Sequence, residues 1–437
     1  MTMSLQIVSH RELALCAALL LPVPLVAQQI DTLRLGVLQR QAEAADHRAA
    51  QRELVARQSD LRVRSIERER LPTMTLLGQA QHLSDVTSFA GGGPLAPPAP
   101  YQTQYDAAAS LRAVLVDPTR GDRRALEAAQ RTEAEARIAT TLWSRRDQVS
   151  DAFFQVARLE AQRQTLVAAR ADLEARRRVA QVRVEGGTAL PSEVLLLEAE
   201  LLRRDQTMDE VEANLAASRE VLASLVGAPV ESDAILVLPD LAEAVAAAVA
   251  TAATDRSRPE FAQFDDSRAV LTARAAALDG VDDPRLSLFG RGGYGRPGLN
   301  QLSRSFDSYY QAGIQVEWSP WDWGRRDRER AAQALQAEIV STEEAAFAES
   351  LARAVVRDRA AIAHLERTLV SDTTVIALRE RILAELRLRF EEGAVTAAEY
   401  VDRETDLLLA RLDRDAHRIR LVEARAHLLT TLGHEVP

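Results

Sequence analysis

The 437-residue chain contains no lysine, so all 54 of its basic residues are arginine. Acidic residues number 64 and the formal net charge is −10, which makes a nucleic-acid partner unexpected because phosphate binding needs a basic face. Aromatic residues make up 4% of the chain, which limits the compact core that it can build. No apolar run reaches the roughly 18 residues that a transmembrane helix requires, so any membrane insertion must use another structure.

The single cysteine, Cys16, lies in an N-terminal segment that reads as a targeting sequence. Arg11 precedes an apolar run over residues 13–21, and a plausible cleavage site follows at Ala27. This order predicts a secretory signal peptide over residues 1–27. The residue before Cys16 is too large for a lipoprotein signal, so no lipid anchor is expected. The mature chain would have no thiol, which excludes disulfides and cysteine-based metal or catalytic sites.

The chain repeats itself with an offset of about half its length. Tyr105 and Asp117 recur as Tyr310 and Asp322, each 205 residues later (310 − 105 and 322 − 117). Glycine-containing segments farther along repeat with an offset of 206, as in 393 − 187. One residue of slip over more than a hundred positions favours an internal duplication over two unrelated alanine-rich helical stretches.

Each half contains a window in which apolar and polar residues alternate, at 72–116 and at 284–320. Alternation with a period of two predicts β-strands that have one apolar and one polar face. Each strand is near the ~9–11 residues of a tilted transmembrane β-strand. We therefore predict one β-hairpin in each window. The apolar positions include Met74, Leu76, Ala107, Leu111, Leu286, Leu288, Ile314 and Val316.

Eleven of the nineteen aromatic residues lie within residues 72–116 and 284–323, far more than the length of these windows would give by chance. Membrane barrels carry rings of Tyr and Trp at both interfaces. Five of these residues are therefore candidate membrane-interface aromatics: Tyr105, Tyr310, Trp318, Trp321 and Trp323. The alternative is a pair of soluble hairpins packed on a helical core.

The remainder of each half is predicted to be helical, beginning with residues 31–71 and 240–279. Very long helices are expected over 120–184 and 325–391, and at ~1.5 Å per residue each would run roughly 100 Å. A seven-residue repeat in these stretches predicts that they coil around partner helices. One such stripe consists of Val355, Ile362, Leu369, Ile376, Leu383 and Phe390.

These signals divide the chain into a duplicated unit and predict an α+β fold that is mostly α. The signal peptide (1–27) is followed by a first repeat (28–227) with a helix, the hairpin 72–116 and a helical hairpin over 120–226. Residues 228–258 link the repeats and are expected to form a small side layer. The second repeat (259–437) has a helix, the hairpin 284–320 and a helical hairpin over 325–433.

About four strands per chain cannot close a barrel, since the smallest bacterial barrels have about eight. Open sheet edges cannot face lipid. If these strands enter a membrane, several copies of the chain must therefore share one barrel, and closure alone allows any number from two upward. In such a barrel the polar strand faces would line a lumen that continues into a helical tube. This arrangement is that of a conduit.

The order and spacing of the duplicated motifs cover nearly all of the mature chain. They are Tyr105–Arg120 and Tyr310–Arg325, Arg183-x-x-x-Gly187-Thr188 and Arg389-x-x-x-Gly393-Ala394, and the closing Leu225-Val-Gly227 and Leu432-Gly433. In these features the chain resembles the outer-membrane efflux protein (TolC-like) family. The resemblance implies a homotrimer in the outer-membrane lipid, in which each chain forms one third of a twelve-stranded β-barrel continued by a periplasmic α-helical barrel. It also implies docking on a periplasmic adaptor bound to an inner-membrane pump, in tripartite efflux or type I secretion.

The resemblance also implies a periplasmic gate. In that family, acidic residues just after the second turn help to close the periplasmic end, and Glu399 and Asp402 occupy the matching positions. An aromatic hydroxyl and a basic residue often accompany them, but Phe390 and Val395 stand at those places, which leaves Arg389 as the available cation. The alternative is a solvated acidic pair on a surface helix.

The turns of the helical hairpins are the candidate adaptor-docking tips, and they consist of Gly187, Thr188, Gly393 and Ala394. Small residues allow a partner's backbone to approach closely, although a helix turn needs glycine in any case.

No feature of the sequence predicts an enzyme. The string Gly290–Gly295 matches GxGxxG, but Pro297 follows where a dinucleotide site needs a helix, so it reads as a strand end and loop. We find no metal-ligand spacing, cofactor motif or catalytic triad with motif support. The sequence thus favours a passive exit duct, and the alternative is a periplasmic coiled-coil protein without a pore.

Overall fold

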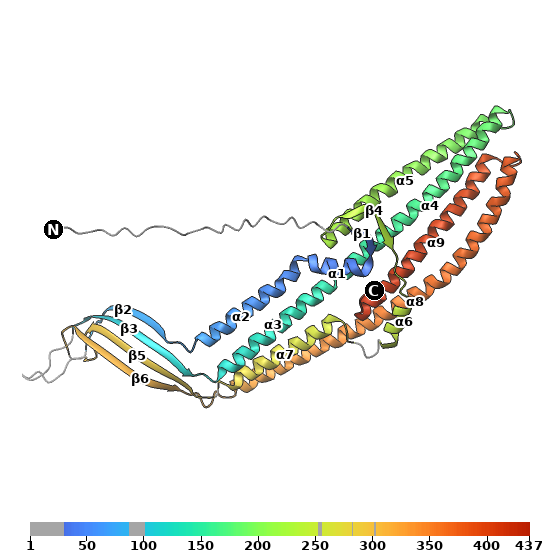
Figure 1. The fold of residues 1–437 in the computed structure, drawn as a ribbon. Coiled ribbons are helices and arrows are strands. Elements are labelled where there is room, and N and C mark those ends of the chain that lie inside the picture. The colour runs from blue at the N-terminus through green and yellow to red at the C-terminus, as the bar shows by residue number, and fades with distance from the viewer. Residues whose placement is uncertain (1–29, 87–100, 252–255, 282, 301–302) are drawn as a thin grey trace, which may run out of the picture.

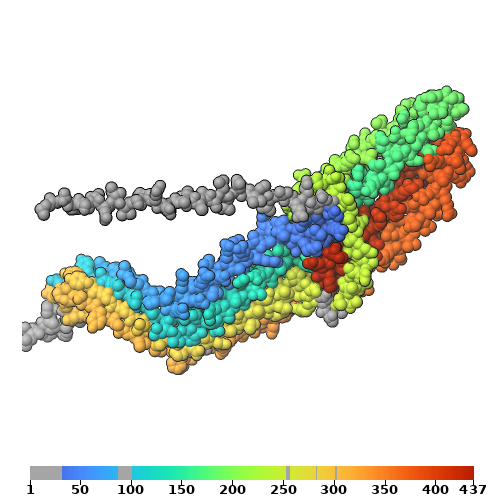
Figure 2. All heavy atoms as spheres, viewed as in Figure 1, coloured from blue at the N-terminus to red at the C-terminus, as the bar shows by residue number. Residues whose placement is uncertain are grey.

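A computed structural model describes residues 30–86, 101–251, 256–281, 283–300 and 303–437. The predicted signal peptide, residues 1–27, lies outside the described residues. The fold is a mostly helical α+β arrangement. Figure 1 shows a four-stranded sheet at one end of an elongated chain and the tips of two long helical hairpins at the other. Figure 2 shows that the two parts form one continuous, bent body.

The four-stranded sheet is antiparallel, with the order β2-β3-β5-β6. Its strands are β2 (Thr73–His82), β3 (Thr103–Val116), β5 (Arg285–Arg296) and β6 (Asp307–Glu317). The first two lie within the predicted window 72–116 and the other two within 284–320. Strands β3 and β5 pair along their length, so the duplicated halves meet at the centre of the sheet. Within the described chain, β2 and β6 each keep one edge without a partner strand.

Two long helical hairpins follow the sheet. They consist of α3 (Thr119–Trp143), α4 (Arg145–Glu185) and α5 (Pro191–Val226), and of α8 (Arg325–Glu391) and α9 (Ala397–Leu432). Helix α8 runs for 67 residues without a break. The prediction of one helix over 120–184 is wrong, because Ser144 interrupts it. The Ser144 hydroxyl donates to the carbonyl oxygen of Thr141 at 2.8 Å, a local bond that competes with the regular helical ladder.

A small layer surrounds the waist of the molecule. Strand β1 (Ile30–Arg34) pairs in parallel with β4 (Val230–Val237), and α6 (Ala242–Thr251) follows β4. The prediction of helix from residue 31 is therefore wrong for the first residues, because they pair with β4 and bury Leu33 in the core. Helical structure begins with α1 (Leu35–Ala45), η1 (His47–Ala50) and α2 (Gln51–Arg68), and α7 (Pro259–Asp279) occupies the matching place in the second half.

The apolar core is concentrated at two levels. The larger cluster lies at the waist, where α1, α4, α5 and α9 meet, and it contains the edge-to-face pair Phe153 and Phe154. The smaller cluster lies near the helical tips and joins both hairpins through Leu173, Leu197, Phe390 and Tyr400. None of the described helices carries an apolar stretch of the length and hydropathy that membrane crossing needs.

Candidate functional site

The sheet has two faces of different chemistry. Leu76, Ala109 and Gly292 follow one another across three strands and mark one face. The apolar side chains on this face are exposed, and they are Met74, Leu76, Leu111, Leu288, Ile314 and Val316. A row on the opposite face consists of Thr75, Ser110, Arg291 and Gln311. An exposed apolar face that backs a polar one is the arrangement of a sheet between lipid and an aqueous lumen.

The five aromatic residues predicted for the membrane interfaces lie toward the two ends of the sheet. Tyr105 and Tyr310 lie toward the end that is distal to the helices, and Tyr310 is 84% exposed. Trp318, Trp321 and Trp323 follow β6 at the helical end and are 61%, 73% and 85% exposed. Eight residues separate Tyr310 from Trp318 (318 − 310), about 26 Å along a strand. This span is close to the roughly 25 Å apolar band of membrane barrels.

The polar face carries a charged cluster toward the end that is distal to the helices. The Asp106 carboxylate accepts a hydrogen bond from the Tyr309 hydroxyl at 2.5 Å and forms an ion pair with Arg291. Gly293 lies beneath the Tyr309 ring, and a Cβ at this position would lie 2.6 Å from Tyr309 Cζ. The glycine-rich string thus belongs to β5 and makes room for an aromatic side chain.

The duplicated aspartates connect the sheet to the long helices. Asp117 accepts hydrogen bonds from the backbone and side chain of Thr119 at the start of α3. Asp322 accepts from the backbone N–H groups of Gly324 and Arg326, at 3.1 and 2.9 Å, at the start of α8. Both carboxylates satisfy N–H groups that a helix start leaves free, which explains why they recur at the same place in each half.

The tips of the two helical hairpins have the same backbone geometry. Gly187 and Gly393 adopt left-handed conformations, with φ of 70° and 80°. The N–H groups of Thr188 and Ala394 each donate to the carbonyl five residues earlier, at 2.8 Å. This is a Schellman ending, which requires glycine. The backbone geometry of the turns therefore explains why glycine stands at both positions. Docking of an adaptor on the tips stays a prediction.

The side chains at the two tips are not equivalent. Arg183, at the first tip, donates from Nη1 to the carbonyl oxygen of Phe390 at 2.8 Å, and its guanidinium lies 5.2 Å from the Phe390 ring. Arg389 occupies the duplicated position in the second half, but its side chain is 57% exposed and pairs with Glu385 on its own helix. The first tip thus contacts the second through Arg183, whereas the ion pair of Arg389 is with its own helix.

The predicted gate residues lie on the surface of α9. Glu399 is exposed, and its backbone N–H bonds to the side chain of Thr396 as part of the helix cap. Asp402 is 68% exposed and lies 3.6 Å from Arg403. Within one chain, Arg389 pairs with Glu385 and the structure does not bring it to either acid. Their role as a gate stays a prediction about the assembled protein.

A buried polar cluster lies between the hairpins, close to these residues. The Tyr400 hydroxyl donates to Asp172 Oδ2 at 2.6 Å, and burial together with this bond raises the pKa of Tyr400. Arg176 lies beside the Tyr400 ring and pairs with Glu391 at 2.7 Å. The cluster connects α4 of the first hairpin to α8 and α9 of the second.

The same cluster continues into a buried ion pair. Arg204 of α5 binds Glu404 of α9 at 3.0 Å and Glu200 on its own helix at 3.0 Å, and the side chains of Arg204 and Glu404 are 7% and 5% exposed. Burial raises the pKa of Glu404 to about 7 against the opposing effect of Arg204, and the carboxylates of Asp172 and Glu200 add to the rise. A carboxyl group of this kind changes its charge near neutral pH.

Sequence reasoning missed this cluster although its signal is present. Arg204 stands three residues after Leu201, and Glu404 stands four residues after Tyr400. These spacings place both charges on the apolar stripes that were expected to pack against partner helices. A charge of each sign on facing stripes is therefore the pattern that marks a buried pair.

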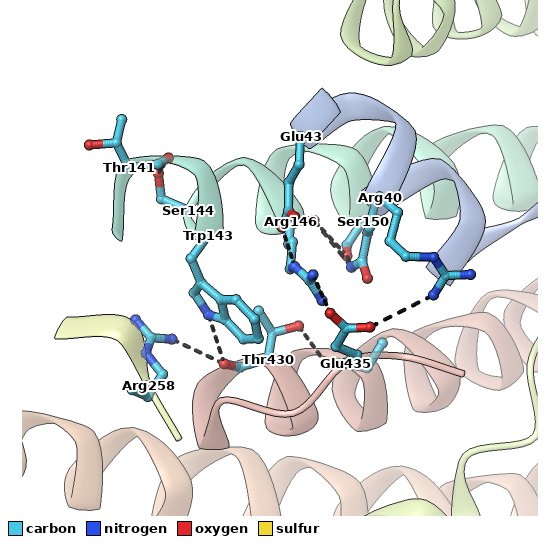
Figure 3. A network of polar contacts seen from close by, with 12 residues as sticks. Arg40, Glu43, Thr141, Trp143, Ser144, Arg146, Ser150, Arg258, Thr430 and Glu435 are labelled. Atoms are coloured by element: carbon cyan, nitrogen blue, oxygen red, sulfur yellow. Dashed lines mark hydrogen bonds and ion pairs between the residues drawn. The ribbon is translucent and has the colours of Figure 1, made fainter. Parts of the chain in front are cut away.

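A second polar network fixes the waist. Figure 3 shows Arg146 pointing between Glu43 of α1 and Glu435 of the C-terminal tail. Arg146 Nη2 lies 2.9 Å from Glu435 Oε1, and the guanidinium lies 4.3 Å from the Trp143 ring. Trp143 Nε1 donates to the carbonyl oxygen of Thr430 at 3.3 Å. The network joins the start of the chain, the break between α3 and α4, and the end of the chain.

The structure is similar to solved outer-membrane channels. It matches the outer membrane protein VceC of Vibrio cholerae with a TM-score of 0.65 and 14% identity, over 92% of this chain and 96% of that one. For the open state of the MtrE outer membrane channel of Neisseria gonorrhoeae the TM-score is 0.63 and the sequence identity 15%. The match covers 92% of this chain and 89% of that one. For the CmeC outer membrane channel of Campylobacter jejuni the TM-score is 0.62 and the sequence identity 12%, and the match covers 91% of this chain and 85% of that one.

At these identities the similarity shows a shared fold. The resemblance to TolC-like outer-membrane efflux channels, inferred from the duplicated motifs, is thereby confirmed at the level of the fold. At the level of sequence, neither a family model nor a curated protein matches the chain.

Proposed function

We propose that this chain, which has the fold of TolC-like outer-membrane efflux channels, forms an outer-membrane exit duct as a homotrimer. The observation that carries the proposal is the sheet. In the part of the chain that the structure describes, its strands β2 and β6 have open edges. Its apolar face is exposed, and its other face is polar. Unpaired edges cannot lie in lipid, so the edge of one copy must pair with the edge of the next.

Three copies would give a barrel of twelve strands. Closure excludes a single copy, and the resemblance to TolC-like channels favours three among the remaining numbers. The apolar faces with their aromatic rings would contact the outer-membrane lipid. The polar faces, with Asp106, Arg291 and Tyr309, would line the lumen. The helical hairpins would extend the lumen into the periplasm as a tube.

The duct would be passive and would work within a tripartite efflux or type I secretion system. An inner-membrane pump would supply the energy, because we identify no nucleotide-binding motif in this chain. A periplasmic adaptor would dock on the tips formed by Gly187, Thr188, Gly393 and Ala394. The two tips share one backbone geometry, which supports a docking surface that repeats around the tube.

The duplication also suggests how neighbouring copies meet at the tips. Arg183 binds the carbonyl oxygen of Phe390 within one chain. The duplicated positions are Arg389 and Val184 (389 − 183 and 390 − 184 are both 206). In a tube where first and second hairpins alternate, Arg389 would bind the Val184 carbonyl of the neighbouring copy. Glu399 and Asp402 would then form acidic rings near the closed end, with Arg389 beside them.

Fractionation and bilayer recording test the proposal together. The purified mature protein should be recovered from outer membranes as a heat-modifiable trimer and should form ion-conducting pores in planar bilayers. A water-soluble monomeric rod that leaves bilayers silent would contradict the proposal and favour the alternative of a periplasmic coiled-coil protein without a pore. A membrane-embedded dimer or tetramer would contradict only the copy number.

A further inference from the structure

We propose that the distal end of the apolar sheet face binds the phosphate of an anionic lipid headgroup through Arg296 and Arg304. The inference rests on the proposed function, because it places this face in a membrane. It adds a specific lipid contact that apolar and aromatic residues alone would not make.

The site is built on the face that is expected to contact lipid. Tyr105 pairs with Arg296 in the β3–β5 register, and Ala107 pairs with Tyr294, so the three long side chains belong to the apolar face. Phe306 stacks on Tyr294 with ring centroids 5.6 Å apart and on Tyr105 at 6.2 Å. The stack forms a rigid platform at the end of the sheet that is distal to the helices.

Both guanidinium groups lie on aromatic rings of this platform. The Arg296 guanidinium carbon lies 4.5 Å from the Tyr101 centroid, 5.0 Å from Phe306 and 5.4 Å from Tyr105. The Arg304 guanidinium carbon lies 4.3 Å from the centroid of Tyr101. Tyr101 thus contacts both cations. Stacking on rings holds the planar groups in place and leaves Nη1 of Arg296 and the guanidinium of Arg304 without a hydrogen bond to any described residue, available for an oxygen ligand.

Carboxylates do not neutralise these two cations. Among the described residues neither Arg296 nor Arg304 forms an ion pair. Arg296 Nη2 donates to the carbonyl oxygen of Thr103 at 3.4 Å, and its Nε is buried without a hydrogen-bond partner in this part of the chain. Arg291 stands five residues before Arg296 on the same strand but belongs to the polar face, where it pairs with Asp106. Arg296 and Arg304 therefore place two unneutralised positive charges, both in contact with Tyr101, at one end of the apolar face.

The position of the two cations selects a lipid phosphate. They stand at one end of an exposed apolar surface, and the ring of Trp318, Trp321 and Trp323 marks its other end. This places them at headgroup depth when the apolar band spans the bilayer. Arginine forms paired hydrogen bonds with phosphate oxygens, and basic side chains at this depth attract anionic lipids. A freely dissolved anion would make no contact with the apolar surface beside the site, whereas the acyl chains of a lipid would.

The test compares the R296Q/R304Q double variant with R112Q, which changes an exposed arginine on the polar face of the same sheet. Each protein is purified in neutral detergent and titrated with phosphatidic acid, and lipid bound per trimer is measured by native mass spectrometry. We expect binding by the wild type and by R112Q, and about thirtyfold weaker binding by the double variant. Equal binding by all three proteins would overturn the inference.

Two further arms separate the possible failures. Inorganic phosphate at the same concentration should leave lipid binding unchanged, and competition by it would assign the site to a dissolved anion instead. Insertion into vesicles of neutral phosphatidylcholine is measured for all three proteins. Insertion without a preference for phosphatidic acid would defeat this inference alone, whereas failure of the wild type to insert would defeat the proposed function.

Discussion

Arg183 Nη1 donates to the carbonyl oxygen of Phe390 at 2.8 Å and so connects the tips of two hairpins that lie 207 residues apart in the chain (390 − 183). The contact uses a carbonyl in the last turn of α8, which also accepts a hydrogen bond from the backbone N–H of Gly393 at 3.1 Å. A cation at this place also complements the negative end of the helix dipole. This side chain thus adds a polar contact to the apolar cluster and the Tyr400–Asp172 bond that also join the two hairpins near their tips.

Replacing this side chain should separate the tips. The R183Q variant loses a charge-assisted hydrogen bond and a ring contact, together worth about 1.5–3 kcal/mol. Spin labels at T188C and A394C report the distance between tips, and the mature chain would contain no native thiol that interferes. We expect a longer and broader distance distribution in R183Q and no change in R178Q, whose arginine is 63% exposed on the same helix. Identical distributions would show that apolar packing alone holds the tips.

The duplicated contact between neighbouring copies predicts a different effect for Arg389. In R389Q each copy would lose its bond to the neighbour's Val184 carbonyl, so the oligomer should dissociate at a lower temperature on a heat-modifiability gel. The control is R387Q, because Arg387 is similarly exposed on α8 and pairs with Glu391 on the same helix. If both variants dissociate at the wild-type temperature, the tips of neighbouring copies do not meet in this way.

Glu404 should make the packing of the hairpins depend on pH. Because burial raises its pKa from 4.5 to about 7, the folded protein holds this proton more tightly than the unfolded chain. The free energy of unfolding that the protonated Glu404 contributes is fully present below pH 4.5, its ordinary pKa, and is lost as the pH rises through about 7.

The pH profile of thermal denaturation tests this assignment. Going from pH 7 to 5.5 should stabilise the wild type relative to E404Q by about 2 kcal/mol. The E198Q variant removes an exposed carboxylate of α5 and should follow the wild-type profile. Parallel profiles for the wild type and E404Q would mean that Arg204 keeps Glu404 ionised throughout.

The acidic pair on α9 predicts an electrical effect. Rings of like charge attract cations and resist close approach. The E399A/D402A variant should therefore show a higher single-channel conductance in planar bilayers, or a weaker block by magnesium. Asp413 lies on the same helix, exposed and farther from the tip, so D413A should behave as the wild type does. Unchanged conductance and block in the double variant would remove both acids from the gate.

Local chemistry was sufficient to predict the four strands of the antiparallel sheet, the turns at the hairpin tips and the starts of α3 and α8. Alternation over residues 72–116 and 284–320 reflects a sheet with one apolar face, and this face carries the side chains that the pattern named. Gly187 and Gly393 mark the tips because only glycine adopts their backbone geometry without cost. The duplicated aspartates mark helix starts because a carboxylate satisfies free N–H groups there.

Features that depend on distant partners were not predictable in this way. Strand β1 forms because it pairs with β4, and Ile30 meets Val230 across 200 residues of chain (230 − 30). The break at Ser144 lies in a sequence that favours helix, and it coincides with the Arg146 network contributed by α1 and the C-terminal tail. Arg204 and Glu404 lie on apolar stripes of the sequence, but only the packing of the two hairpins against each other shows that they pair.

The Arg146 network predicts a large loss of stability from one substitution at the waist. The Arg146 side chain is 4% exposed. R146A would leave Glu43 without this cation and Glu435 with Arg40 alone, at 3.8 Å, and would remove the contact with Trp143. Removing one partner of a buried pair costs about 3–5 kcal/mol, and we expect the lower end because Glu43 and Glu435 are 25% and 57% exposed.

Urea unfolding followed by tryptophan fluorescence measures this loss. The R137A control removes an arginine that is 65% exposed on α3, and it should change stability by no more than about 0.5 kcal/mol. The R146M variant keeps the packing of the side chain without its charge, so its stability separates the two contributions. If R146M equals the wild type, packing on Trp143 rather than charge pairing holds the waist. If R146A is no less stable than R137A, the network does not hold the waist at all.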